Sequence, residues 1–168
     1  MALKAIDASR LTCNPFEMLS KQWALLGAGN LEKFNMMTVS WGAVGVIWGK
    51  PSVTVYVREN RYTKTFIDAD DTFVLSFLKD GHRDALNVLG SKSGRDMDKM
   101  HESGLTPVAI EGGVTFEEAA LVLVCRKRYA QDMPKENFLQ DETLEKWYPD
   151  GNYHTMYIGE IVAAYAAD

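Results

Sequence analysis

The alternation of residue types over Ser52–Arg58 constrains the fold more than any other feature of this chain. Val53, Val55 and Val57 alternate with a serine, a threonine and a tyrosine. A period of two places successive side chains on opposite faces of an extended strand, and β-branched residues favour that conformation. The pattern therefore predicts a β-strand with one buried face.

Other segments rich in β-branched and aromatic residues also favour strands, and capping and periodic signals between them favour short helices. The predicted strands are Met37–Trp48, joined to Ser52–Arg58 through Gly49-Lys50-Pro51, then Thr72–Leu78, Ala119–Tyr129 and His154–Ala164. The first predicted helix begins at Asn14-Pro15 and ends before Gly27. The other predicted helices are Asn60–Ala69, His82–Leu89, Asp96–Ser103 with Gly104 as C-cap, and Glu142–Trp147. Strands outnumber the longer helices without regular βαβ crossovers, which predicts a mainly β fold, an antiparallel barrel with peripheral helices.

The length indicates one domain over residues 1–168, and the cysteine spacing indicates that both cysteines are reduced. The chain has 168 residues, 46% of them hydrophobic, with no repeat or linker. That length suffices for one well-buried core. Cys13 and Cys125 have no CxxC partner, so no disulfide framework is predicted, and Cys125 lies in an apolar run typical of a core.

Charge and hydropathy exclude several function classes. A formal charge of −5 argues against a general nucleic acid binder, which needs clustered Lys and Arg. No stretch approaches the about 18 apolar residues of a membrane span, and Met1–Arg10 lacks a secretory signal, so we expect a cytoplasmic protein with no membrane partner. The three histidines are isolated, which predicts no metal site, and no dinucleotide fingerprint, phosphate loop or serine elbow is complete.

The segment Arg58–Lys64 is a candidate phosphate site at a junction from strand to helix. With Asn60 as N-cap, the free N–H groups of Arg61, Tyr62 and Thr63 would face an anion along the helix dipole. Arg58 and Arg61 could add charge-assisted bonds. An ordinary solvated helix start is the alternative.

A second candidate anion site is the turn Gly90–Arg95. Ser91, Lys92 and Ser93 lie between two glycines, so successive N–H groups could wrap an anion beside the lysine charge. Taken alone, the same composition favours an ordinary exposed loop.

A third feature is the run Asn35–Gly42, where polar residues interrupt an apolar strand. Thr38 and Ser40 could hydrogen-bond to a planar, partly polar ligand, and Trp41 could provide a flat apolar wall. Plain barrel packing explains the run equally well.

Together these segments resemble the flavin reductase-like proteins with the FMN-binding split barrel, and in particular the flavoredoxin-like branch. The resemblance runs along most of the chain. It is carried by Asn35–Gly42, Trp48–Pro51, Val55–Arg58 with Arg61–Thr63, Gly90–Asp96 with Asp98-Lys99, and Tyr153-His154 with Ile158–Ile161.

The resemblance implies a six-stranded antiparallel split β-barrel that forms a homodimer, with FMN near the interface and NADH or NADPH docking over the flavin. By position, the residues expected along the isoalloxazine and ribityl chain are Asn35, Thr38, Val39, Ser40 and Trp41. Those expected around the phosphate are Arg58, Arg61, Tyr62, Thr63, Ser91, Lys92 and Ser93. His154 is a further candidate contact of flavin or nicotinamide.

The implied activity is an NAD(P)H-dependent FMN reductase. Hydride would pass from nicotinamide C4 to flavin N5, and electrons would leave to free flavin, oxygen or a partner protein. The cofactor carries this chemistry, so no catalytic acid, base or nucleophile is expected from the protein. Two alternatives remain open: a non-enzymatic, flavoredoxin-like electron carrier, for which the acidic charge suits a basic redox partner, and a relative that has lost its flavin.

Overall fold

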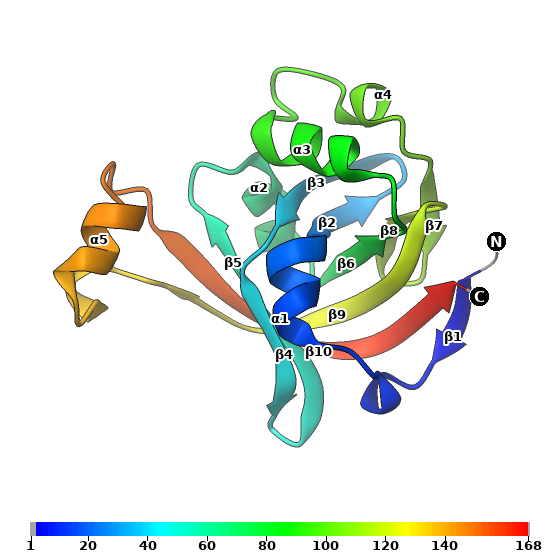
Figure 1. Ribbon diagram of the computed structural model, residues 1–168, viewed down its shortest axis with the longest axis horizontal. Helices are drawn as coiled ribbons and strands as arrows, with labels where there is room; N and C mark the ends of the chain where they lie inside the picture. The colour runs from blue at the N-terminus through cyan, green and yellow to red at the C-terminus, as the bar shows by residue number, and fades with distance from the viewer. Residues whose placement is uncertain (1–2, 168) are drawn as a thin grey trace.

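The computed structural model describes residues 3–167 and consists of ten strands with short helices between them (Figure 1). The strands are β1 (Leu3–Ile6), β2 (Ala24–Asn30), β3 (Lys33–Val39), β4 (Gly42–Ile47), β5 (Lys50–Arg58), β6 (Thr72–Leu78), β7 (Pro107–Ile110), β8 (Gly113–Phe116), β9 (Ala119–Asp132) and β10 (His154–Ala167). The helices are α1 (Pro15–Glu17), α2 (Tyr62–Ala69), α3 (Arg83–Ser91), α4 (Lys99–Ser103) and α5 (Asp141–Trp147), with the 3₁₀ turns η1 (Ala8–Arg10) and η3 (Lys135–Asn137) and the π-helical turn η2 (Met18–Gln22).

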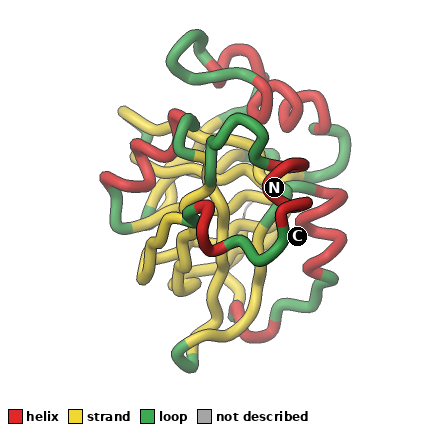
Figure 2. The backbone as a smooth tube through the Cα atoms, turned by 90° about the vertical axis from the view of Figure 1, so that its left-hand side faces the viewer, coloured by secondary structure: helices red, strands yellow, loops and turns green. Residues whose placement is uncertain are grey.

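The main sheet is antiparallel and follows the order β3-β2-β6-β9-β10-β5-β4, with β1 on β10 and β7-β8 as a separate hairpin. Figure 2 shows the strands running through the middle of the molecule, with most helices at its periphery. Within residues 3–167 no pairing joins β3 to β4, so the barrel is split there. The predicted mainly β, antiparallel fold with peripheral helices is confirmed. The sheet has eight strands in place of the expected six: seven follow the path from β3 to β4, and β1 is the eighth, paired with the end of β10.

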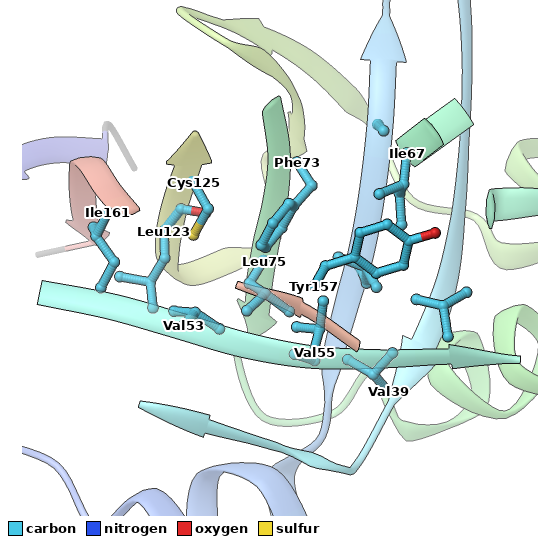
Figure 3. Close-up of a cluster of buried hydrophobic side chains, with 14 of the residues drawn as sticks. Val39, Val53, Val55, Ile67, Phe73, Leu75, Leu123, Cys125, Tyr157 and Ile161 are labelled. Carbon is cyan, nitrogen blue, oxygen red and sulfur yellow. The ribbon is translucent and has the colours of Figure 1, made fainter. Parts of the chain in front are cut away.

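Both faces of β2 and β3 are covered, which explains their apolar sequences. Leu26 and Met37 point into the barrel core, whereas their neighbours Leu25 and Met36 pack beneath α3 and α4. Alternation in a strand sends adjacent side chains to opposite faces, so two adjacent buried residues require two cores. Figure 3 shows the barrel core, where valines of β5 meet side chains of β6, β9 and β10 around Tyr157.

The prediction of one strand over Met37–Trp48 is wrong, because β3 ends at Val39 and β4 begins at Gly42. The connection between β4 and β5 is also shorter than the predicted Gly49-Lys50-Pro51. Trp48 and Gly49 have φ values of 51° and 69° and form a two-residue hairpin turn, so Lys50 and Pro51 already belong to β5. Pro51 fits there because it lies beyond the residues of β5 that pair with β10.

Four strands were not predicted: β1, β2, β7 and β8. In β2 the sequence Ala-Leu-Leu-Gly-Ala-Gly has low strand propensity, and pairing with both β3 and β6 makes the strand. The predicted helices are present with shifted ends, and Gly104 is the expected left-handed C-cap at φ 66°. Asn60 is not the N-cap of α2: Arg61 has that position and its own N–H bonds to the Arg58 carbonyl. None of the described helices is long and apolar enough to cross a membrane.

Candidate functional site

A groove of about 430 Å³ opens where the barrel is split, between the end of β3 and the start of β10. We call it the central groove. Its lining residues are Met37, Thr38, Val39, Ser40, Trp41, Tyr56, Arg58, Arg61, Trp147 and His154. The groove therefore has a strand edge along one side, aromatic rings around it and two arginines at one end.

The start of α2 and the turn Gly90–Arg95 contact each other beside this groove. Nη1 of Arg61 donates to the Gly90 carbonyl at 3.2 Å, and Nη1 of Arg95 donates to the Asn60 carbonyl at 3.2 Å. The Arg95 guanidinium also lies over the Tyr62 ring, 4.8 Å from its centre. Two segments about thirty residues apart thus form one cationic corner. The predicted wrap of successive free N–H groups is not present, because Gly90 and Ser91 end α3 and the N–H groups of Lys92 and Arg95 bond to Val88 O and Ser93 Oγ. The charges of the corner can still act on a single anion.

Asn35 and Thr63 form a buried polar contact under this corner. The Asn35 side-chain amide donates to the Thr63 hydroxyl at 2.8 Å, and the two residues are 5% and 1% exposed. A Cβ on Gly94 would lie 2.3 Å from the Asn35 amide oxygen, so only glycine allows the turn to approach so closely. The side chains of Asn35 and Thr63 therefore join β3, α2 and the glycine turn.

Lys99 is a buried cation in the same corner, 6% exposed. Its ammonium donates to the Met36 carbonyl at 2.9 Å and to the Leu89 carbonyl at 3.1 Å, which ties β3 to the end of α3. Burial, with a smaller effect from the Arg61 charge, lowers the pKa of Lys99 from 10.5 to about 8. Lys99 adds positive charge behind the turn without lining the groove.

The edge of β3 supplies backbone groups to the groove. Among the described strands β3 is an edge strand, since it pairs with β2 alone. Lys99 reaches the Met36 carbonyl from the open side, and strand alternation then places the N–H and C=O of Thr38 on that same open edge. The Thr38 hydroxyl proton is already used, because it bonds to the Leu86 carbonyl at 2.5 Å. Thr38 therefore offers a ligand its backbone groups and not a hydroxyl donor.

Arg58 lines the groove, but its guanidinium holds the loop after α5. It donates to the carbonyls of Trp147 and Asn152 at 2.8 and 3.0 Å, and it lies over the Tyr148 ring at 5.2 Å. Asp150 is 3.9 Å away. Arg58 thus fixes the segment that carries Trp147 over the groove, and the free hydrogen-bonding capacity for an anion lies mainly on Arg61.

His154 closes the far side of the groove as a buried, neutral imidazole. Its ring lies 5.4 Å from the Trp41 ring, and Trp147 meets Trp41 edge-on at 4.9 Å. Burial, together with the charges of Arg58 and Arg61, lowers the pKa of His154 from 6.5 to about 4. The groove therefore has no proton-transferring histidine near neutral pH.

Two further hollows adjoin the central groove. An apolar groove of about 520 Å³ shares Ser40, Trp41 and Tyr56 with it. A polar groove of about 490 Å³ shares Arg58, Arg61 and Trp147 with it and adds Lys146. The lining therefore changes from apolar in the first groove, through mixed in the central groove, to basic in the polar groove.

The predicted site residues fall into two groups. Those lining the central groove are Thr38, Val39, Ser40, Trp41, Arg58, Arg61 and His154. Those lying outside its lining, in or beside the cationic corner, are Asn35, Tyr62, Thr63, Ser91, Lys92 and Ser93. Sequence reasoning missed Met37, Tyr56 and Trp147, which line the central groove, and Tyr148, which lines the apolar groove. Tyr56 had a signal, since it faces away from the buried valines of β5.

A larger hollow of about 860 Å³ lies between the N-terminal segment and the end of β6 and contains none of the predicted residues. Its Arg83 is engaged with the Lys21 carbonyl and lies 4.2 Å from the centre of the Trp23 ring. Within residues 3–167 no group of three or more His, Cys, Asp or Glu side chains is placed to hold a metal ion.

The fold and the groove define a class of open antiparallel barrels with a ligand-sized cleft at the split. The chain belongs to the flavin reductase like domain family, whose model matches residues 17–168. The resemblance seen in the sequence is thereby confirmed. No curated protein sequence gives a significant match.

Solved structures with the same fold include the flavoredoxin of Methanosarcina acetivorans, at 24% identity and a TM-score of 0.69 over 88% of this chain and 69% of that one. An FMN-binding domain of a flavin reductase-like enzyme from Shewanella baltica OS155 has 16% identity and a TM-score of 0.69 over 98% and 77%. The NADH:FAD oxidoreductase of Streptomyces globisporus C-1027 has 18% identity and a TM-score of 0.66 over 87% and 75%. At these identities the likeness concerns the fold.

Proposed function

We propose that this chain is a single FMN-binding domain that accepts electrons from NADH or NADPH and passes them to free flavin, oxygen or a partner protein. The observation that carries the proposal is the contact between the start of α2 and the turn Gly90–Arg95, at the end of a groove lined by Thr38–Trp41. In the proposed complex this contact would join the phosphate site to the site of the planar ring. Family membership supports the same ligand.

The polarity of the adjoining grooves fits the parts of FMN. The apolar and central grooves share Trp41 and Tyr56, which suit an aromatic ring system. The open edge of β3 suits the ring carbonyls and nitrogens, and the cationic corner suits a phosphate monoester. The occupied donors of Arg58 leave Arg61 as the main side-chain contact of that phosphate.

The protein's own residues would orient the ligand and exclude water. The rings of Trp41 and Trp147 cover the groove, and the Arg58 bonds hold Trp147 in place. When bound, FMN supplies the hydride-accepting and electron-donating chemistry. No described residue needs to transfer a proton, which fits the neutral state of His154.

A homodimer is part of the proposal. Several large apolar side chains are exposed near the apolar groove and on the β4–β5 hairpin: Phe16 at 82%, Val46 at 76% and Trp48 at 60%. A second copy of the chain would cover this surface and seal the ring end of the site. Light scattering of the FMN-loaded protein should give twice the mass of one chain.

The test is an absorption and fluorescence titration with FMN, followed by steady-state oxidation of NADH and of NADPH. We expect saturable FMN binding and turnover with at least one nicotinamide. Protein that binds FMN but oxidises neither nicotinamide would overturn the reductase. A colourless protein that takes up no FMN would overturn flavin binding itself.

The electron carrier is the second candidate, favoured by the formal charge of −5, which suits docking of a basic redox partner. Reduction of the bound flavin by a partner protein, with no reduction by either nicotinamide, would select it.

A further inference from the structure

Tyr148 is the one polar partner that His154 has among the described residues. Its hydroxyl lies 2.7 Å from His154 Nδ1, and the two residues are 7% exposed each. Tyr148 follows directly after α5, and His154 begins β10. The bond therefore links the loop that covers the groove to the strand that forms its far wall.

The other ring nitrogen of His154 faces the groove. Within residues 3–167 Nε2 makes no hydrogen bond, yet no buried side-chain nitrogen or oxygen lacks a partner. Nε2 therefore reaches the surface, and the surface that His154 reaches is the central groove. A ligand in that groove meets Nε2 and not Nδ1.

The direction of the Tyr148 bond decides what Nε2 can do. A neutral imidazole has one donor and one acceptor nitrogen. If Tyr148 accepted the bond, its own hydroxyl proton would have no acceptor in the described chain, which is unfavourable for a residue that is only 7% exposed. If Tyr148 donates, both Nδ1 and the hydroxyl proton are satisfied. Donation by Tyr148 is therefore the stable arrangement.

The charges around the ring prevent a second proton. Arg58 lies over the Tyr148 ring at 5.2 Å, and both Arg58 and Arg61 line the groove with His154. The nearest carboxylate to Arg58, that of Asp150, is 3.9 Å from it and is not a partner of His154. Burial and these arginines keep the pKa of His154 at about 4, so the ring stays neutral near pH 7.

We propose that Tyr148 is a positioning residue that locks the single proton of His154 on Nε2, so that His154 acts as a neutral hydrogen-bond donor to an acceptor atom of the bound ligand. This inference rests on the proposed flavin site. The acceptor is a carbonyl oxygen or a lone-pair nitrogen, on either the flavin ring or the nicotinamide carboxamide. His154 would thus read hydrogen-bond acceptors without moving a proton.

The first test is the histidine ¹⁵N spectrum of the ligand-free protein at pH 7. We expect His154 to show a protonated Nε2 and an unprotonated Nδ1. In Tyr148→Phe the spectrum should move toward a mixture of both tautomers. A proton on Nδ1 in the wild type, or a Tyr148→Phe spectrum identical to the wild type, would overturn the lock. Because no flavin is needed, this result is independent of whether FMN binds.

The second test is a double-mutant cycle on ligand affinity. Tyr148→Phe should weaken FMN binding, or raise the nicotinamide KM, by roughly threefold to tenfold, the range of one neutral hydrogen bond. The parameter that changes identifies the molecule that carries the acceptor. The same change in a His154→Ala background should have no effect. An equal effect in both backgrounds would show a merely structural role and overturn the proposal.

Tyr153→Phe is the matched control. Its ring stacks on Tyr148 at 5.3 Å, and its hydroxyl makes no hydrogen bond within residues 3–167. We expect wild-type tautomer and wild-type affinity. His154→Gln, which keeps a donor near the position of Nε2, should restore most of the affinity lost in His154→Ala, and an absence of rescue would contradict the donor role.

Discussion

Arg61→Ala tests the cationic corner at the charge that lines the central groove. Arg61 is the N-cap of α2, and its side chain lines both the central and the polar groove. One of its N–H groups is bonded to the Gly90 carbonyl, which leaves the others for an anion. In the proposed complex these groups contact the phosphate of FMN.

The magnitude follows from the type of bond. Loss of one charge-assisted hydrogen bond should weaken FMN binding by roughly 1.5–3 kcal/mol, about tenfold to a hundredfold. The effect should be near the lower end, because Lys99 stays behind the turn and the N–H groups at the start of α2 are unchanged. The residual affinity should also depend less on salt.

The assay compares FMN with riboflavin, which has the same ring and ribityl chain but no phosphate. Titration of flavin fluorescence should show the full loss for FMN and less than about a twofold change for riboflavin, since a neutral ligand gains little from the arginine charge. Arg126→Ala is the matched control, because Arg126 is an exposed arginine of β9 away from the grooves.

Two results would refute the reasoning. Unchanged FMN affinity would mean that Arg61 is an ordinary surface arginine. An equal loss for FMN and riboflavin would mean that the substitution deforms the groove, for example by releasing the Gly90 turn, and that no phosphate lies at the corner.

Three further predictions concern stability. Gly159→Ala should destabilise the fold by about 1–3 kcal/mol in urea unfolding, because its Cβ would lie 2.6 Å from Phe73 Cζ; Gly45→Ala, with no atom within 4 Å of the new Cβ, should stay close to wild type. Lys99 has a folded pKa of about 8 against 10.5 unfolded, so the unfolded state binds more protons between these values, and wild-type stability should rise with pH there relative to Lys99→Met. His154 has a folded pKa of about 4 against 6.5, so wild type should lose stability relative to His154→Gln as pH falls from 6.5 to 4; parallel pH curves would contradict either shift.

The sequence predicted those parts of the fold whose cause is local. The strands β5 and β6 were predicted correctly, because the alternating valines of β5 and the continuous apolar run Thr72–Leu78 show directly which residues are buried. The strand β2 was not predicted, because pairing on both sides overrides its weak strand propensity. The break between β3 and β4 at Ser40-Trp41 was also not predicted, because an apolar run does not show where the chain leaves one edge of the sheet and enters the other.

The site was predictable as a set of segments and not as a set of contacts. Composition indicated the arginines, the glycine turn and the β3 run. It could not show that Arg58 donates its hydrogen bonds to the carbonyls of Trp147 and Asn152, or that Asn35 and Thr63 bond to each other. Trp147 and Tyr148 were not predicted because their place depends on the long arm of β9 and β10, which carries α5 at its end (Figure 1). Only in the folded chain does Trp147 of α5 meet Trp41 at the groove. Contacts between distant segments depend on the whole topology.

The location of the site follows from the way the barrel fails to close. β3 and β4 end the sheet path and are joined only by Ser40 and Trp41, so two strand edges leave backbone N–H and C=O groups without a strand partner. Such groups are costly if they are buried unpaired, and exposed edges invite aggregation. Lys99 satisfies the Met36 carbonyl on this edge, but Thr38 is two residues farther along, beyond its reach. In the proposed complex, a planar ligand with ring carbonyls and nitrogens would pair with that edge as a missing strand would, so we expect the ring-binding end of the groove at the split.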